Sequence, residues 1–279
     1  QLAQPACARE TLMPPQDRHI RNVLKLFEAH GHRHDRYTLF SDCMELIAIS
    51  ISNSVDIRSR DHREARYLQI VGRYDRPTIE MFPRILGEIT MALETAPGDV
   101  LGSIFTALEI HNKSRGQFFT PYPVCQMMAE VTLGDAQSAR ALIADKGYVR
   151  AMEPACGAGA MVIALAQAML AADINYQRHL HVTAVDIDPR AVHMAYIQFS
   201  LLHIPAHLMV GNSLSNDVRE HWFTPAHILG GWSAKLANQP RVVEPPPRSA
   251  PQRAGDRSSP CTPPPDAKPR TIGEQFTLF

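Results

Sequence analysis

Residues 148–171 restrict the fold of this 279-residue chain more than any other segment. A short apolar stretch, 148–152, is followed by Glu-Pro-Ala-Cys-Gly-Ala-Gly and then by an alanine-rich stretch, 158–171. This order predicts a strand, a glycine-containing turn and a helix. The glycines allow the backbone to approach a ligand closely, and the helix N-terminus behind them offers free N–H groups. We therefore expect an α/β fold with a ligand pocket at the carboxyl end of the first strand.

The segments that follow repeat the alternation of strand and helix. A second strand is expected at 181–185, a second helix at 189–203 and a third strand at 208–210, which together indicate a parallel sheet with crossover helices. Before them, apolar residues at helical spacing predict four or five helices, with Ser41-Asp42 and Asp99 as N-caps. The chain thus divides into a helical domain, 1–110, a partial Rossmann-like domain, 111–240, and a Pro-rich, disordered tail, 241–279.

The amino-acid composition mainly argues against certain kinds of partner, cross-link and location. Lys+Arg and Asp+Glu both number 28, so net charge does not indicate a polyanionic partner, and any nucleic-acid surface has to be a local patch. The five cysteines are scattered without CxxC spacing, which argues against disulfides and zinc and favours a cytoplasmic protein. No membrane span or signal peptide is evident, although the chain starts at Gln1, with Met13 as an alternative start. His30, His32 and His34 form either a metal site or, the interpretation we favour, a polar loop.

Acidic residues flank the glycine turn. A dinucleotide site requires a third glycine where this chain has Val162, and Glu153 before the turn would repel a phosphate. The same carboxylate could hold an ammonium group, which favours S-adenosylmethionine, a cation without phosphate. Asp186 ends the second strand, where ribose hydroxyls bind in such folds. Asp188 before Pro189 is explained as a cap of the next helix, and the two roles are compatible.

Four segments in this order resemble motifs X, I, II and III of the N6-adenine DNA methyltransferases: 116–121, 153–162, 184–192 and 211–215. The resemblance covers roughly residues 99–215 and is greatest to modification subunits of type I restriction systems and related mobile-element proteins. It implies a bacterial S-adenosylmethionine-dependent methyltransferase fold, with DNA as partner. It also implies cofactor contacts from the following residues: Phe119, Thr120, Pro121, Glu153, Pro154, Ala155, Gly157, Gly159, Asp186, Ile187 and Asn212.

Within that set the resemblance implies distinct roles. Residues 119–121 contact the methionine end of the cofactor, and Glu153 faces its amino group. Asp186 binds the ribose and Ile187 packs on the adenine. Asn212 stands where the family usually has an acid, and an amide can still hydrogen-bond an adenine edge.

The family's catalytic motif, Asn/Asp-Pro-Pro-Tyr/Phe, does not occur after the third motif, and the nearest similar residue is Asn238. Only three strands of the expected sheet are identified, which leaves the first strand as an edge for the N-terminal helices or a partner to cover. Two hypotheses follow: an adenine methyltransferase completed by a second subunit, or an accessory protein that has lost catalysis. Trp222 and Trp232 offer either a stacking surface or, the interpretation we favour, core anchors.

The last residues form a separate short motif. Gln275, Leu278 and Phe279 resemble the peptide with which bacterial replication and repair proteins bind the sliding clamp. A flexible tether would present such a peptide to a pocket. Chance occurrence of a five-residue pattern is the alternative.

Overall fold

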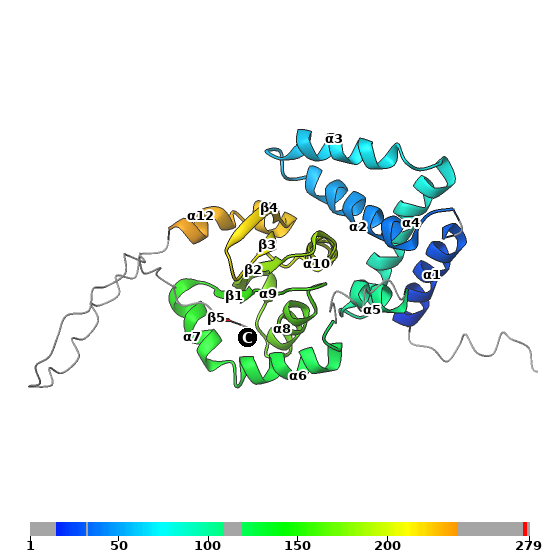
Figure 1. Cartoon of the computed structure of the whole chain (residues 1–279). Helices are drawn as coiled ribbons and strands as arrows, with labels where there is room; N and C mark the ends of the chain where they lie inside the picture. The colour runs from blue at the N-terminus through cyan, green and yellow to red at the C-terminus, as the bar shows by residue number, and fades with distance from the viewer. Residues whose placement is uncertain (1–14, 32, 109–118, 239–275, 278–279) are drawn as a thin grey trace, which may run out of the picture.

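The computed structural model describes residues 15–31, 33–108, 119–238 and 276–277. A helical part leads into an α/β part, and the two pack side by side (Figure 1). The helical part consists of α1 (Pro15–His30), α2 (Arg36–Asn53), α3 (Arg60–Val71), α4 (Arg76–Thr95) and α5 (Val100–Ala107).

Aspartates begin three of these helices. The side chain of Asp35 accepts a hydrogen bond from the Thr38 N–H at the start of α2, and Asp75 does the same for Thr78 at the start of α4. Asp99 caps α5 as predicted. The predicted cap at Ser41-Asp42 is wrong, because α2 has already begun at Arg36 and Asp42 lies inside it.

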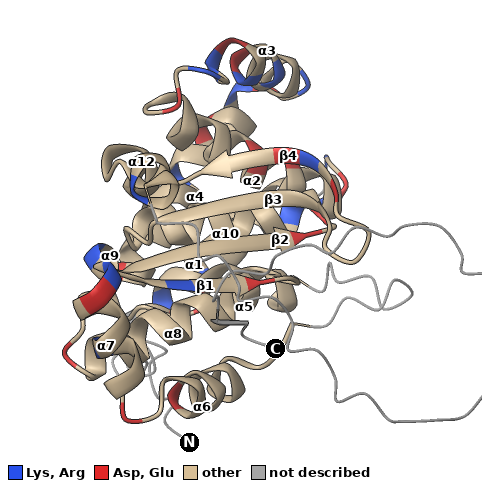
Figure 2. Ribbon diagram, turned by 90° about the vertical axis from the view of Figure 1, so that its left-hand side faces the viewer, with Lys and Arg blue, Asp and Glu red and all other residues tan. Residues whose placement is uncertain are grey.

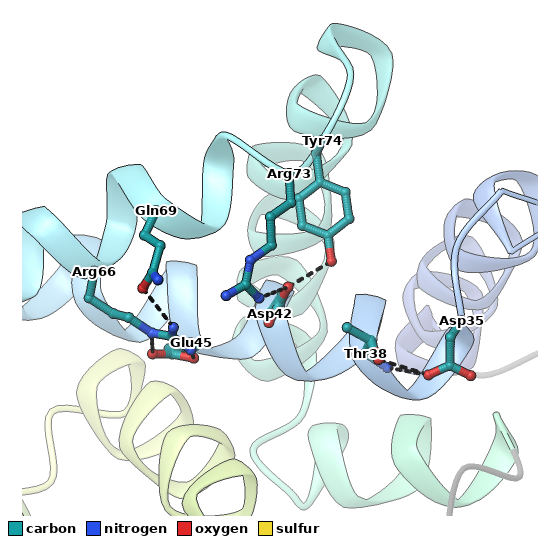
Figure 3. A network of polar contacts seen from close by, with 8 residues as sticks. All are labelled: Asp35, Thr38, Asp42, Glu45, Arg66, Gln69, Arg73 and Tyr74. Carbon is teal, nitrogen blue, oxygen red and sulfur yellow. Dashed lines mark hydrogen bonds and ion pairs between the residues drawn. The ribbon is translucent and has the colours of Figure 1, made fainter.

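Asp42 instead belongs to a polar network that joins α2 to α3 and to the segment after it (Figure 3). Its Oδ2 accepts hydrogen bonds from the Tyr74 hydroxyl at 2.8 Å and from Arg73 Nη1 at 3.2 Å. One turn further along α2, Glu45 binds Arg66 through two hydrogen bonds of 2.6 and 2.9 Å. A half-buried network of this kind fixes the relative orientation of the two helices.

The α/β part contains a five-stranded sheet in the order β4-β3-β2-β1-β5. All neighbouring pairs are parallel except β3 and β4, which run antiparallel with a bulge at Val210/Gly211. The predicted parallel sheet is therefore confirmed, whereas β4 and β5 were not anticipated. The elements are α6 (Tyr122–Leu133), α7 (Gln137–Lys146), β1 (Val149–Glu153), α8 (Ala160–Ala171), α9 (Tyr176–His179), β2 (Leu180–Asp186), α10 (Pro189–Leu201), β3 (Ala206–Asn212), β4 (Asp217–Phe223), α11 (Pro225–Leu229), α12 (Trp232–Ala237) and β5 (Phe276–Thr277).

One face of the sheet is covered more fully than the other. On β1, Val149, Ala151 and Glu153 are buried, whereas Arg150 and Met152 between them are half-buried. In Figure 2 the less covered face is turned to the viewer, and α8 and α10 lie behind the strands. Helix α10 contacts the sheet on one side and α2 on the other, so that all its residues from 190 to 200 are buried.

Arg63 provides a second connection between the helical part and the sheet. From α3, its guanidinium donates to the His221 carbonyl at 2.8 Å and to Asp56 Oδ2 at 2.7 Å. The same guanidinium lies 4.1 Å from the ring centroid of Trp222, on β4. A buried arginine that is paired and stacked in this way holds β4 against α3.

Helices α11 and α12 pack near the amino ends of β1 and β2. Thr224 caps α11. The rings of His227, on α11, and His181, on β2, form a hydrogen bond of 2.9 Å. The hydroxyl of Tyr148, directly before β1, donates to the Lys235 carbonyl of α12 at 3.4 Å. Trp222 and Trp232 are 4% and 2% exposed, so the interpretation of both as core residues is correct.

Among the described helices, none combines the length and apolarity that a membrane span would require. The Pro-rich segment before β5 lies outside the described residues, and so does His32 of the histidine-rich turn. No cluster of three or more metal-ligating side chains occurs in the part of the chain that the structure describes.

Candidate cofactor site

A cavity of about 460 Å³ opens at the carboxyl ends of β1 and β2. Both strands end in an acidic residue there, and Figure 2 shows these ends in red. The cavity brings together residues from three of the predicted motifs. Its walls are formed by Phe119, Thr120, Cys125, Glu153, Ala155, Cys156, Gly157, Ala158, Ala160, Met161, Asp186, Ile187 and Ala191.

The glycine turn is held against β2 by main-chain groups. The Gly157 N–H donates to Asp186 Oδ2 at 2.9 Å, and the Cys156 N–H donates to the Val185 carbonyl at 2.8 Å. Gly157 has a φ of 52°, and a Cβ there would lie 2.9 Å from the Phe119 ring. The absence of a side chain at 157 therefore lets Phe119 pack directly on the turn. This contact explains why two motifs that are far apart in the sequence form one wall.

Gly159 has a different function. It precedes α8 with a φ of 97°, and a Cβ at this position would lie 2.4 Å from Phe199 of α10. Gly159 does not line the cavity. Its lack of a side chain allows α8 and α10 to approach each other, a role in helix packing that the glycine pattern alone does not distinguish from ligand contact.

Glu153 is the most unusual group in the cavity wall. It is 2% exposed, its Oε1 accepts a 3.2 Å hydrogen bond from the Ala155 N–H, and its Oε2 has no hydrogen-bond partner in the described structure. Burial raises the pKa of this carboxyl group, and the nearby charge of Asp186 raises it further. A buried carboxylate oxygen without a partner destabilises a protein unless a ligand satisfies it. The site thus fits a ligand with a cationic or hydrogen-bond-donating group.

Asp186 lines the cavity and Asp188 caps a helix, as the two roles expected from the sequence require. Asp186 accepts hydrogen bonds from two main-chain N–H groups, those of Gly157 and Asp188, and burial raises the pKa of its carboxyl group. A carboxylate has about four acceptor positions, so Asp186 can still bind hydroxyl groups. Asp188 caps α10 through the Arg190 N–H at 3.0 Å. Ile187 between them is 62% exposed and contributes an apolar surface at the cavity rim.

Three further predicted residues, Pro121, Pro154 and Asn212, do not line the cavity. Pro121 is the N-cap of α6, and Pro154 is a half-buried neighbour of Glu153. Asn212 ends β3, and its side-chain oxygen accepts hydrogen bonds from Leu214 and Ser215 in the turn to β4. These hydrogen bonds give Asn212 a structural role in the turn that requires no ligand.

One residue that supports the site, Gln198, was not predicted from the sequence. Gln198, in the middle of α10, is fully buried and donates to the Ala158 carbonyl at 2.8 Å and to Asp99 Oδ1 at 3.1 Å. Its own oxygen accepts from the Leu101 N–H at 3.1 Å. Gln198 thereby connects the glycine turn to the start of α5. The signal in the sequence is weak, because this amide shares its helix with Arg190, His193 and Ser200.

Asn238, the residue nearest to a catalytic motif, lies far from this cavity. It is the exposed C-cap of α12, which packs on Tyr148 and therefore near the amino end of β1. The cavity lies at the carboxyl end of the same strand, and five residues of extended chain span roughly 16 Å. Asn238 does not belong to the cofactor site.

A largely parallel sheet with a glycine turn after β1 and an acidic residue at the end of β2 is shared by Rossmann-like folds, the S-adenosylmethionine-dependent methyltransferases among them. The sequence model of a family described as N-6 DNA methylase matches residues 98–241, which is more than half of the chain, and the protein belongs to this family. A search of curated proteins found no match.

Among solved structures, one similar chain is a candidate class I S-adenosylmethionine-dependent methyltransferase from Listeria monocytogenes. The TM-score is 0.40 and the sequence identity 14%, over 72% of this chain. The matched region spans 55% of the Listeria chain, so this protein corresponds to little more than half of that length.

Proposed function

We propose that this protein binds S-adenosylmethionine in the cavity at the ends of β1 and β2 and serves the N6-methylation of adenine in DNA. The observation that supports the cofactor most directly is the buried Glu153 Oε2, which lacks a partner and lines the cavity. S-adenosylmethionine carries an ammonium group and no phosphate, which suits a site with two carboxylates. When bound, it supplies an electrophilic methyl group.

Each proposed contact uses a group that the structure places in the wall. Glu153 would accept hydrogen bonds from the ammonium group, and Asp186 would accept them from the ribose hydroxyls. Ile187, largely exposed at the rim, would cover one face of the adenine. Phe119 and Thr120 would border the methionine end, because both line the cavity beside the glycine turn.

Calorimetric titration with S-adenosylmethionine tests the cofactor assignment. Hydrogen bonds to charged groups contribute about 1.5–3 kcal/mol, so Glu153→Gln is expected to weaken binding roughly tenfold or more. Glu94→Gln is the matched control, because Glu94 is an exposed residue of α4. Absence of binding to the parent protein, or equal affinities of the two variants, would contradict the assignment.

DNA methylation requires a second measurement. A target adenine has to leave the duplex to reach a cofactor pocket, so the substrate assay should use unmethylated duplex DNA and tritiated cofactor, followed by digestion to detect N6-methyladenine. The 279 residues contain no Asn/Asp-Pro-Pro-Tyr/Phe motif. We therefore propose that a second subunit supplies the catalytic group, as in a modification complex of a restriction system or mobile element. Transfer by the purified chain alone would refute the need for that subunit.

The position of Asn238 favours a second candidate function. Because this residue lies at the opposite end of β1 from the cavity, the chain could hold the cofactor and act on DNA as an accessory protein in a bacterial cytoplasm. Cofactor binding without transfer, even when partner subunits are added, would support that function. Transfer in a reconstituted complex would exclude it.

We also propose the replication sliding clamp as a partner, because residues 275–279 resemble a clamp-binding peptide. Gln275, Leu278 and Phe279 lie outside the described residues, so the support is the sequence pattern alone. Deletion of residues 275–279 should abolish binding to the clamp in biolayer interferometry. Unchanged affinity after the deletion would remove this partner from the proposal.

A further inference from the structure

A second cavity lies between the helical part and the α/β part. Its volume of about 730 Å³ exceeds that of the cofactor cavity, and Ile187 is the residue that lines both. Residues 187–190 and His193, at the start of α10, form one side. The opposite side comes from Tyr37, Ser41 and Glu45 of α2, Arg66 of α3 and Glu220 of β4. We call this space the His193 cavity.

His193 is the buried polar group in its wall. The residue is 4% exposed, and neither of its ring nitrogens has a hydrogen-bond partner in the described structure. Its ring packs edge-on against Trp222, with the centroids 4.9 Å apart. Burial lowers the pKa of His193, so at neutral pH one ring nitrogen donates and the other accepts. Buried polar atoms without partners destabilise the fold, and a ligand with both an acceptor and a donor would satisfy them.

The charges around His193 disfavour an anionic ligand. Three carboxylates line the cavity, and two of them are paired with its two arginines. Glu45 binds Arg66, as Figure 3 shows, and Asp188 binds Arg190 at 2.6 Å. The third carboxylate, Glu220, opposes the lowering of the His193 pKa and therefore lies near the ring. A phosphate would meet this excess negative charge, whereas an amino group could donate to Glu220.

We propose that the His193 cavity is a second ligand site, and that it binds an uncharged heterocycle with an amino group, such as the base of a nucleoside. The amino group would donate to Glu220, and the neighbouring acceptor atom would bind the N–H of His193. Adenine, cytosine and guanine carry an amino group beside an acceptor, whereas thymine carries only carbonyl oxygens and a ring N–H. Tyr37, Ile187 and Pro189 add apolar surface for a flat ring. A cavity of about 150 Å³ already accommodates benzene, so a nucleoside has sufficient room.

This site is separate from the cofactor contacts. The inference rests on His193 and Glu220, and neither residue lines the cofactor cavity. A ligand here would lie beside Ile187, next to any cofactor bound at the ends of β1 and β2. The second site can therefore be occupied whether or not the protein binds S-adenosylmethionine, and failure of the cofactor titration leaves this inference standing.

Nuclear magnetic resonance of the full chain with isotope-labelled histidine tests the site. The His193 signal is assigned as the one that His193→Leu lacks. It should shift on titration with deoxyadenosine, deoxycytidine or deoxyguanosine, and thymidine should bind at least tenfold more weakly than the best of these three. An unmoved His193 signal with all four nucleosides, or equal affinity for thymidine, would overturn the proposal.

Two substitutions separate ligand binding from folding. His193→Leu removes unpartnered buried polar atoms, so its urea midpoint should equal or exceed that of the parent, while calorimetry should show at least a tenfold loss of nucleoside affinity. A purely structural role for His193 predicts a lower midpoint instead, which would contradict the proposal. Glu220→Gln should also weaken binding at least fivefold, whereas Glu130→Gln, an exposed change on α6, should not. Equal affinities of these two variants would exclude Glu220 as the acceptor and the proposal with it.

The same base could arrive as a free nucleoside or within a single strand. A neighbouring cavity of about 300 Å³ shares Glu45, Arg66 and Glu220 with the His193 cavity and also contains His62 and Arg219. A strand would continue into it and place its phosphates near the two arginines. A short deoxycytidine oligonucleotide that binds at least tenfold more tightly than deoxycytidine identifies the strand as the source, and equal affinity identifies the free nucleoside.

Discussion

Replacement of Gly159 by alanine tests the conclusion that this glycine is required by helix packing. The new methyl group would lie 2.4 Å from Phe199 Cε1 and 3.4 Å from Ala195 Cβ, in a backbone with a φ of 97°. Left-handed backbone costs an ordinary residue about 1–2 kcal/mol, and an extra group in a packed interior costs about 1–3 kcal/mol. The free energy of unfolding should therefore fall by about 2–5 kcal/mol.

Gly147→Ala separates the two contributions. Gly147 follows α7 with a φ of 85°, and nothing lies within 4 Å of a Cβ built there. Its replacement should cost only the backbone contribution. In a folded region of this size each kcal/mol lowers the Tm by roughly 2–4 °C, so Gly159→Ala should melt several degrees below Gly147→Ala.

A double-mutant cycle with Phe199→Leu completes the test. A smaller residue at 199 relieves the clash with a methyl group at 159, so the two substitutions together should cost less than their sum, by about 0.5–3 kcal/mol. Urea unfolding monitored by circular dichroism gives the required free energies. Equal destabilisation by Gly159→Ala and Gly147→Ala, or strict additivity in the cycle, would refute the packing argument.

Three further predictions concern the histidine contact, the buried glutamine and the ribose acid. Burial lowers the pKa of His181 to about 3 and that of His227 to about 4 from an ordinary 6.5, so the unfolded chain binds more protons below pH 6.5. The contribution of these two histidines to stability should be constant above that pH and fall as the pH drops towards 4, by about 2 kcal/mol at pH 5 for His227 alone. His227→Gln should therefore reduce the change in urea midpoint between pH 7.5 and 5. Gln198→Leu removes one hydrogen bond from each of three buried groups, of which Asp99 Oδ1 still accepts from the Gly102 N–H. The free energy of unfolding should fall by about 2–4 kcal/mol, whereas a loss below 0.5 kcal/mol would show that the network contributes little. Asp186→Asn should weaken cofactor binding at least tenfold in calorimetry, while Asp173→Asn, an exposed change that the left-handed backbone tolerates, should leave it unchanged.

The order of elements around the cofactor cavity could be predicted because each boundary has a local signal. The glycine turn separates β1 from α8, and Asp188-Pro189 begins α10. Glu153 and Asp186 were expected near the ligand because the carboxyl ends of parallel strands meet at one edge of a sheet. The structure places both in the cavity wall, and their contact with cofactor remains a prediction.

Features that depend on contacts between distant segments were not predictable. In strand β4 only Trp222 is buried, so buried and exposed residues do not alternate along it. The sequence therefore carries little signal for its pairing with β3. Ser41-Asp42 resembles a cap, but the preceding Asp35 already satisfies the start of the helix. Gly157 and Gly159 look equivalent in the sequence, and only the positions of Phe119 and Phe199 assign one to the cavity and the other to helix packing.

Helix α10 has no face in contact with solvent from residue 190 to residue 200. It lies between the sheet and α2, and Gln198 on it binds both the glycine turn and the start of α5. Arg63 adds a separate connection from α3 to β4. The helical part and the sheet therefore cannot separate without exposing one shared helix and breaking buried hydrogen bonds. We expect the two parts to behave as one cooperative unit with a single thermal transition, in which a ligand that binds beside the sheet also protects the helices that lie beyond it.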